Sequence, residues 1–329
     1  MKAIVVERAG GPDAMRLADV ADPEVGAGDV LIRVAGAGVN RADVLQRMGF
    51  YPPPQGASEV LGLEVSGEVV ATGADVQQGR NGDRVMALIE GGGYAELALA
   101  PATQVMTLPA GVGDVVAAGG IPEVFITGHD ALFTRGRLQR GETVLIHGGA
   151  GGVGSATVQL AKRAGARVVV TAGSAEKLQR ASELGADAGI DYSSEDFATR
   201  TLEITDGHGA DVIIDVMGAV YLERNVSVLA ADGRLVSVGL QGGVSAELDL
   251  RLLHAKRGSI IATALRARPP AQKAAIVAAF AGDALAGFAD GTLRPVVHRV
   301  LPLADATEAH ELLENGEVIG KLVLRAGAE

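Results

Sequence analysis

Short apolar runs separated by turn residues dominate the first third of the chain. Glycine, proline and aspartate punctuate the intervals between these runs, which cover residues 30–34, 65–70, 84–88 and 94–98. Runs of this length with such boundaries are typical of β-strands. The pattern therefore predicts a β-rich domain over about the first 108 residues.

From residue 141 onwards, strand-type and helix-type segments alternate. The strand-type runs are residues 143–147, 167–171, 211–215, 234–239 and 259–264, and helical patterns between them cover residues 155–164, 175–184 and 197–204. This alternation is typical of βαβ units, which build a parallel sheet with helices on its faces. We predict an α/β fold with a doubly wound parallel sheet in this half of the chain.

The alternation ends at Pro269 and Pro270. The remaining pattern predicts a helix towards residue 286 and then shorter elements, which are residues 295–300, 305–314 and 321–324. Because these elements do not continue the βαβ series, we expect them to return to the first domain. The expected domains are residues 1–118 with 268–329, and residues 119–267.

The segment LIHGGAGGVGSATVQLAKRAGA, residues 145–166, is the most informative for function. Gly149, Gly151 and Gly154 match G-x-G-x-x-G, directly after a strand-type run and at the start of an amphipathic helix. In that context the glycines allow a tight turn, close approach of a pyrophosphate and close packing of helix on sheet. The segment predicts a dinucleotide site, and a glycine-rich turn without ligand is the alternative.

The residues after the next strand bear on which dinucleotide binds. NAD-binding fingerprints usually carry an Asp or Glu about 20 residues on, but here Ser174 stands there and Lys177 follows shortly after. A hydroxyl and an ammonium suit a 2′-phosphate, so we predict NADPH rather than NADH. In the alternative interpretation Ser174 is a plain N-cap and Lys177 a solvated charge. Tyr192 either lines the adenosine end or packs structurally.

Composition narrows the classes of partner and site. A net charge of −11 and an aromatic content of 3% argue against a nucleic-acid partner. No segment approaches the roughly 20 apolar residues of a membrane-spanning helix. The chain has no cysteine, and its six histidines show no spacing typical of metal ligands. We therefore expect a cytoplasmic protein without metal, nucleic acid or membrane insertion.

Motifs spread over nearly the whole chain point to one known family. They are Gly141, Glu142, Leu145, the glycine loop, Gln159 and Lys162, with GVNRADVLQR from residue 38, YPPP from 51, LGLEVSGEV from 61 and TAGSAEKLQ from 171. Together they resemble the zinc-free, ζ-crystallin-like NADPH quinone oxidoreductases of the medium-chain dehydrogenase/reductase superfamily. The resemblance implies a GroES-like catalytic domain around an inserted Rossmann domain, and a homodimer formed through the strand near residues 260–264.

The resemblance also implies site residues. Cofactor contacts carry over onto Asn40 and Thr127 at the nicotinamide, Gly151, Gly152 and Val153 at the pyrophosphate, Gly173, Ser174, Lys177 and Tyr192 at the adenosine phosphate, and Met217, Gly239, Leu265 and Lys321 around the cofactor. Gly149 and Gly154 join the expected cofactor-binding residues through the glycine fingerprint. Tyr51 and Asn40 are the expected catalytic residues. The Tyr51 hydroxyl could hydrogen-bond a substrate oxygen that gains charge, and a loop aromatic packed on proline is the alternative.

One departure from the wider superfamily bears on chemistry. Zinc alcohol dehydrogenases carry a cysteine near position 40 and Gly-His-Glu near 62, where this chain has Asn40 and Gly62-Leu63-Glu64. Glu64 is interpreted as a structural carboxylate. The implied activity is NADPH-dependent reduction of quinones without zinc, since a quinone accepts electrons readily. Reduction of enones or 2-alkenals, and a non-catalytic crystallin-like protein that binds NADPH, are the alternatives.

Overall fold

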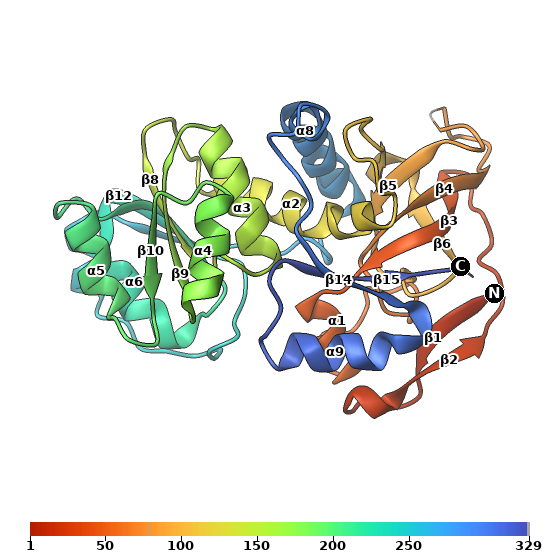
Figure 1. The fold of residues 1–329 in the computed structure, drawn as a ribbon, viewed down its shortest axis with the longest axis horizontal. Helices are drawn as coiled ribbons and strands as arrows, with labels where there is room; N and C mark the ends of the chain where they lie inside the picture. Colours follow the sequence, from red (N-terminus) through yellow and green to blue (C-terminus); the bar gives the residue numbers. More distant parts are fainter. Residues whose placement is uncertain (78, 328–329) are drawn as a thin grey trace. The chain divides into compact units, whose positions relative to one another are not determined.

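The chain folds into two compact units (Figure 1). The computed structural model describes residues 1–77 and 79–327. Unit 1 consists of Met1–Ile126 and Leu265–Glu329, and unit 2 of Thr127–Ala264. Unit 1 is thus made of two separate stretches of sequence, and each unit is described in turn.

Unit 1 is built on a seven-stranded sheet in the order β14-β15-β3-β4-β5-β7, with β6 paired to β3. Its strands are β3 (Asp29–Gly38), β4 (Glu64–Thr72), β5 (Arg84–Leu88), β6 (Leu97–Pro101), β7 (Val105–Thr107), β14 (Val297–Pro302) and β15 (Lys321–Arg325). The pairs are antiparallel except β14 with β15. Strands β1 (Lys2–Val6) and β2 (Met15–Asp19) form a separate hairpin. The two C-terminal strands, blue in Figure 1, therefore complete a sheet begun near the N-terminus.

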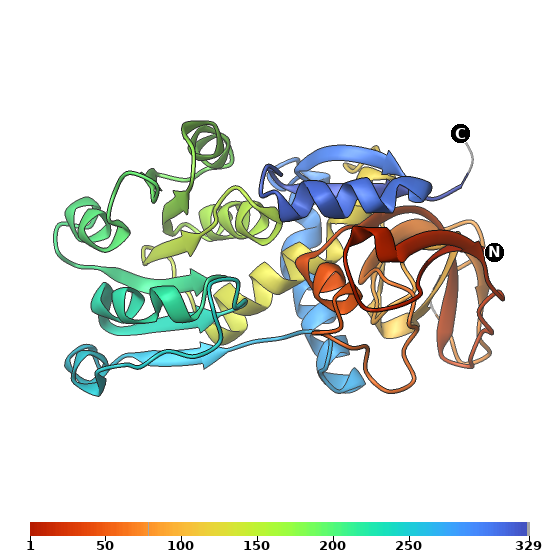
Figure 2. The ribbon, with the colours of Figure 1, turned by 90° about the horizontal axis from the view of Figure 1, so that it is seen from below.

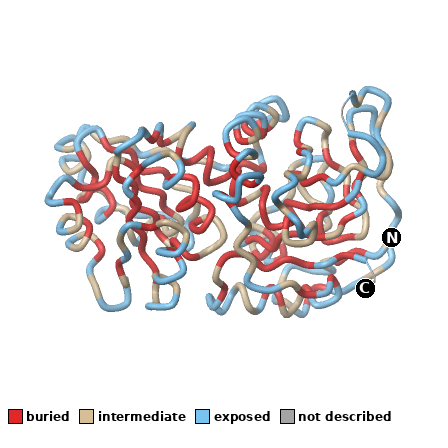
Figure 3. Tube along the Cα trace, turned by 45° about the horizontal axis from the view of Figure 1, so that its top comes forward, coloured by how far each residue is buried: buried red, intermediate tan, exposed pale blue. Residues whose placement is uncertain are grey.

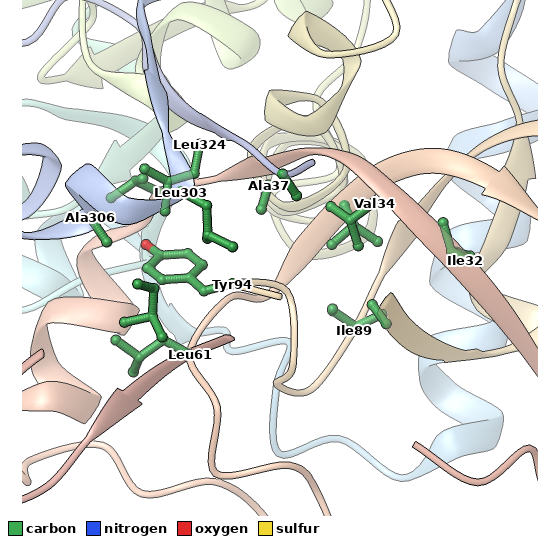
Figure 4. Close-up of a cluster of buried hydrophobic side chains, with 14 of the residues drawn as sticks. Ile32, Val34, Ala37, Leu61, Ile89, Tyr94, Leu303, Ala306 and Leu324 are labelled. Atoms are coloured by element: carbon green, nitrogen blue, oxygen red, sulfur yellow. The ribbon is translucent and has the colours of Figure 1, made fainter. Parts of the chain in front are cut away.

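The core of unit 1 follows from alternation along β3. Val30, Ile32 and Val34 are buried and point to one face, as a period of two requires in a strand. Leu324 of β15 joins the same cluster. Figure 4 shows the ring of Tyr94 within this cluster. The core thus joins both sequence stretches of the unit.

Helices α1 (Arg41–Arg47), α8 (Pro270–Ala289) and α9 (Ala306–Glu314) belong to unit 1, and α2 (Pro122–His129) begins there. Pro270 occupies the start of α8, where a missing N–H costs nothing. The ring of Phe288 in α8 lies 4.9 Å from the ring of Phe125 in α2, edge to face. Among the described residues, no helix is long and apolar enough to cross a membrane.

Unit 2 contains a six-stranded sheet in the order β10-β9-β8-β11-β12-β13, and all neighbouring strands are parallel. The strands are β8 (Thr143–His147), β9 (Arg167–Ala172), β10 (Ala188–Asp191), β11 (Ala210–Asp215), β12 (Leu229–Ser237) and β13 (Ser259–Ala262). In Figure 2 they succeed one another from the green segment to the light-blue β13 at the edge. This order is that of a Rossmann sheet, with its switch point between β8 and β11.

Helices connect the strands of unit 2. They are α3 (Gly152–Arg163), α4 (Ala175–Glu183), α5 (Phe197–Ile204), α6 (Leu222–Ser227) and α7 (Leu250–Lys256). Every residue of β8 is buried, as expected for a strand covered on both faces. Figure 3 shows the buried residues gathered in the interior of each unit and the exposed residues around it. The predicted α/β fold, with a GroES-like unit and a doubly wound unit, is confirmed.

Candidate active site

The glycine loop of unit 2 joins β8 to α3. Packing leaves no room for a side chain at two of its glycines, but it leaves room at the third. A Cβ at Gly149 would lie 2.6 Å from the Val170 side chain, and one at Gly154 would lie 2.1 Å from the Gly148 carbonyl oxygen. Packing within the unit therefore requires both glycines. A Cβ at Gly151 would meet only the Gly148 oxygen, at 3.4 Å. The bare backbone at Gly151 is thus not explained by packing, and it suits close approach of a ligand.

The start of α3 can receive an anion. Gly151 is the N-cap and brings no side chain, and the first turn contains no acidic residue. The N–H groups of Gly152, Val153 and Gly154 fall in this turn, where helical geometry provides no acceptor within the helix. The positive end of the helix dipole adds to their attraction for a pyrophosphate. The predicted dinucleotide contacts therefore fit the local structure.

Four predicted residues meet at the carboxyl ends of β9 and β10. The Ser174 Oγ accepts a hydrogen bond from the Lys177 backbone N–H at 3.3 Å, so Ser174 is the N-cap of α4. A Cβ at Gly173 would lie 2.5 Å from the Tyr192 hydroxyl oxygen, and Tyr192 is 48% exposed. The N-cap bond uses Ser174 as acceptor and leaves its hydroxyl proton available to a phosphate. The structural role of Ser174 is therefore compatible with the predicted one.

Four other predicted cofactor residues lie outside the glycine loop and the start of α4. Met217 and Gly239 follow β11 and β12 at the carboxyl edge of the sheet, and their backbone N–H groups bond to Asp215 at 2.8 and 3.2 Å. That edge is where ligands bind in open α/β sheets. Thr127 is buried in α2, and Leu265 is buried at the start of the second stretch of unit 1.

Asn40, Glu64 and Lys321 form a buried triad in unit 1. The Lys321 Nζ donates to the Asn40 Oδ1 at 2.7 Å and to the Val39 carbonyl oxygen at 2.6 Å, and lies 2.8 Å from the Glu64 Oε1. The Asn40 Nδ2 donates to Glu64 at 2.9 Å and to the Gly38 carbonyl oxygen at 3.3 Å. All three ammonium protons and both amide protons are thus engaged. The triad joins α1, β4 and β15.

The donor set of this triad does not suit a zinc ion. Asn40 and Leu63 occupy the positions expected for cysteine and histidine, and the Lys321 ammonium already lies between Asn40 and Glu64. A positive side chain there repels a metal cation. Within residues 1–77 and 79–327, no cluster of histidine, cysteine and acidic side chains could hold a metal ion.

Asp43, which the sequence interpretation did not single out, holds the residues around Asn40 in place. Its carboxylate accepts hydrogen bonds from the Asn40 N–H at 2.8 Å, the Gly62 N–H at 3.1 Å and the Tyr94 hydroxyl at 3.1 Å. Burial raises the pKa of Asp43 to about 6. The spacing Asn40-x-x-Asp43 is an N-terminal capping signature of α1 and could have revealed it.

Tyr51 lies beside Arg266. The Arg266 guanidinium carbon is 5.4 Å from the centre of the Tyr51 ring, and its Nη1 donates to the Tyr51 carbonyl oxygen at 3.2 Å. Further hydrogen bonds to the Gln46 side chain and the Glu90 carbonyl oxygen fix the guanidinium. The Tyr51 hydroxyl has no hydrogen-bond partner in the described part of the chain. The ring is thus held while the hydroxyl remains available.

Charges around Tyr51 tune its hydroxyl. Burial raises the pKa of Tyr51, the nearby Glu123 raises it further, and Arg266 lowers it. The hydroxyl therefore keeps its proton at neutral pH and can donate it in a hydrogen bond. Glu123 and Arg266 were not identified from the sequence, because nothing local in either segment marks them.

Two family models match the chain. The model described as an alcohol dehydrogenase GroES-like domain matches residues 26–110, which belong to unit 1. The model described as a zinc-binding dehydrogenase matches residues 152–281, which begin with α3 of unit 2. The first match lies within unit 1, and the second covers most of unit 2 and continues into the second stretch of unit 1.

Relatives match over lengths that differ widely. The quinone oxidoreductase of Rattus norvegicus is 33% identical over 328 residues, which are 98% of this chain and 97% of the relative. A phenolphthiocerol/phthiocerol polyketide synthase polypeptide of Mycobacterium tuberculosis is 39% identical over 204 residues, 62% of this chain, but the match spans only 9% of that much longer protein. The structure of Escherichia coli quinone oxidoreductase complexed with NADPH matches with 29% identity and a TM-score of 0.85, and the match covers 99% of this chain and 100% of that chain.

Proposed function

The chain belongs to the quinone oxidoreductases of the medium-chain dehydrogenase/reductase superfamily, and from this membership we propose that it reduces quinones with NADPH and without a metal ion. The observation that carries the proposal is the Tyr51 hydroxyl, which has no hydrogen-bond partner among the described residues. In the same unit, the buried Lys321 ammonium lies between Asn40 and Glu64. A hydroxyl donor at the substrate oxygen can replace the Lewis acid that alcohol oxidation requires.

The proposed cofactor site lies on this chain's own backbone and polar side chains. Gly151, Gly152 and Val153 hold the pyrophosphate at the start of α3, and Ser174 with Lys177 binds the 2′-phosphate. Tyr192 covers the adenosine end. The remaining carried-over contacts are Asn40, Thr127, Gly149, Gly154, Gly173, Met217, Gly239, Leu265 and Lys321. NADPH, when bound, supplies the hydride.

Asn40 and Tyr51 take different parts in the proposed reaction. Because the Asn40 side chain is held by Glu64 and Lys321, its role is to keep the backbone at the start of α1 in place. The Tyr51 hydroxyl donates a hydrogen bond to the quinone oxygen that gains negative charge as hydride arrives. The Arg266 guanidinium beside the ring keeps the tyrosine in this position.

Assembly and location follow as further proposals. Strand β13 forms an edge of the unit 2 sheet, and Ile260 in it is 42% exposed. An unpaired edge strand is a template for pairing with a second strand. We propose that a second copy of this chain pairs there to form a homodimer, and that the protein is cytoplasmic.

The decisive experiment follows the consumption of NADPH with a panel of quinones, enones and 2-alkenals. We expect turnover with quinones, no stoichiometric zinc in the purified protein and full activity in the presence of a chelator, because the Lys321 ammonium between Asn40 and Glu64 repels a metal cation. Turnover with enones or alkenals alone would assign the competing substrate class. Turnover with none of them would leave a binding protein of the crystallin type.

Tyr51 gives a sharper test of the same proposal. Tyr51→Phe removes only the hydroxyl and keeps the ring beside Arg266, so we expect kcat/KM for quinones to fall by roughly 10- to 100-fold, or about 1.4–2.7 kcal/mol. Tyr51→Ala should in addition raise KM through loss of ring contact. Steady-state kinetics of both folded variants measures these effects. Wild-type kinetics in both would exclude Tyr51 from the site.

A further inference from the structure

The Glu123 carboxyl group is the ionisable group near Tyr51 to which the proposed chemistry has given no role. Glu123 is the second residue of α2, and its backbone N–H donates to the Glu64 Oε2 at 2.9 Å. Its main chain is therefore fixed to the buried triad. Its half-buried side chain makes no hydrogen bond or ion pair with residues of the described ranges.

Packing keeps the start of α2 rigid. Phe125 lies two residues after Glu123, and its ring contacts Phe288 of α8 at 4.9 Å. The Phe288 ring also contacts Phe280, at 6.5 Å between ring centres. The bond to Glu64 and the packing of Phe125 on Phe288 hold the main chain at Glu123 in place.

Five ionisable groups from different segments of unit 1 interact electrostatically with Glu123. Two acidic groups, Glu64 and Asp43, act on it together with two cations, Lys321 and Arg266. Tyr51 completes the set, since Glu123 acts on the tyrosine hydroxyl.

The balance among these groups favours the protonated carboxyl. Burial and the neighbouring Glu64 raise the pKa of Glu123 to about 8, although Lys321 works in the opposite direction. The carboxyl group therefore holds a proton at neutral pH. The carboxylate of Asp43 differs from that of Glu123 because three hydrogen-bond donors already bind it, whereas the Glu123 carboxyl group has no such donor among the described residues.

We propose that Glu123 is the proton donor of the reduction, delivering its carboxyl proton to the substrate oxygen that Tyr51 hydrogen-bonds. This role rests on the proposed quinone reductase activity. The substrate accepts hydride, with its electron pair, and becomes a hydroquinone monoanion; the O–H bond of Glu123 breaks and an O–H bond forms on the substrate. Water returns a proton to the Glu123 carboxylate, so one hydride and one proton are added per quinone.

The proposal predicts a defined loss in Glu123→Gln. The amide has the shape of the carboxyl but no proton to give, so kcat should fall by about 100-fold with KM changed little. The loss should grow with the basicity of the hydroquinone monoanion across a quinone series, because a poorer base gains less from a proton donor. The decline of wild-type kcat as the pH rises through about 8 should disappear in the variant. Glu59→Gln, an exposed change in the same unit, is the matched control and should behave as wild type.

The protonation of Glu123 can also be measured directly, without turnover. Carbon NMR of protein labelled at its glutamate carboxyl groups, recorded without ligand, should show one carboxyl that titrates near pH 8 in wild type and in Glu59→Gln but not in Glu123→Gln. Wild-type kcat and pH profile in Glu123→Gln, with quinone reduction intact in wild type, would overturn the role of Glu123 alone. Absence of quinone reduction by the wild-type protein would overturn the proposed function and this role with it.

Discussion

Lys321→Met is expected to lower the free energy of unfolding by about 3–5 kcal/mol, because it leaves the buried carboxylate of Glu64 without its cation. Lys321 is 3% exposed and Glu64 is fully buried, so water cannot replace the lost partner. The Asn40 Oδ1 and the Val39 carbonyl oxygen lose a donor at the same time. Denaturant unfolding followed by circular dichroism measures the change.

Two further variants test whether the loss of stability comes from the stranded Glu64 charge or from removing a lysine in general. Lys2 pairs with Asp19 at 2.7 Å on the surface, with both side chains largely exposed, so Lys2→Met should cost less than about 1 kcal/mol. Adding Glu64→Gln to Lys321→Met removes the stranded charge and should recover part of the stability. Equal losses in Lys321→Met and Lys2→Met would show that the buried pair contributes no more than a surface pair.

The parts of the fold that the sequence predicted are those set by local patterns. Strand β8 has the bounds that its apolar run predicts, and the glycine loop precedes α3 as its spacing requires. Strand β12 begins at Leu229, five residues before the predicted start, because a register shift in its pairing with β11, where Asp232 has a φ of 63°, interrupts the apolar run. Helix α1 went unpredicted inside a β-rich stretch, since seven residues give little periodicity. The domain boundaries after residues 118 and 267 stay predictions.

Site residues that are close in the sequence could be predicted, and those brought together from distant segments could not. Ser174 and Lys177 lie on one turn, so a shared role for them could be proposed from their spacing alone. Arg266 acts on Gln46 from 220 residues away, and Glu123 meets Glu64 across 59 residues. Such contacts arise only when sheet and helices assemble. A single sequence carries no local signal for them.

Lys177→Ala is expected to weaken NADPH binding by about 1.5–3 kcal/mol and to leave NADH binding nearly unchanged. The half-buried Lys177 lies in the first turn of α4, three residues after the N-cap Ser174. A charge-assisted hydrogen bond from its ammonium to the 2′-phosphate exists only with NADPH, because NADH carries a hydroxyl in that place. Calorimetric titration of the purified variant with each cofactor measures both affinities.

Two controls decide whether the charge of Lys177 or the integrity of α4 is responsible. Lys177→Arg keeps a cation at the position and should retain most of the preference for NADPH. Arg180→Ala removes a cation from the same helix, where Arg180 pairs with Glu183 at 2.9 Å on the surface, and should change neither affinity appreciably. If Lys177→Ala weakened both cofactors equally, its effect would come through the fold of α4, and the specificity would have to lie in Ser174 and Tyr192. A loss confined to NADPH, absent in Arg180→Ala and largely restored in Lys177→Arg, follows only from contact between the Lys177 ammonium and the phosphate.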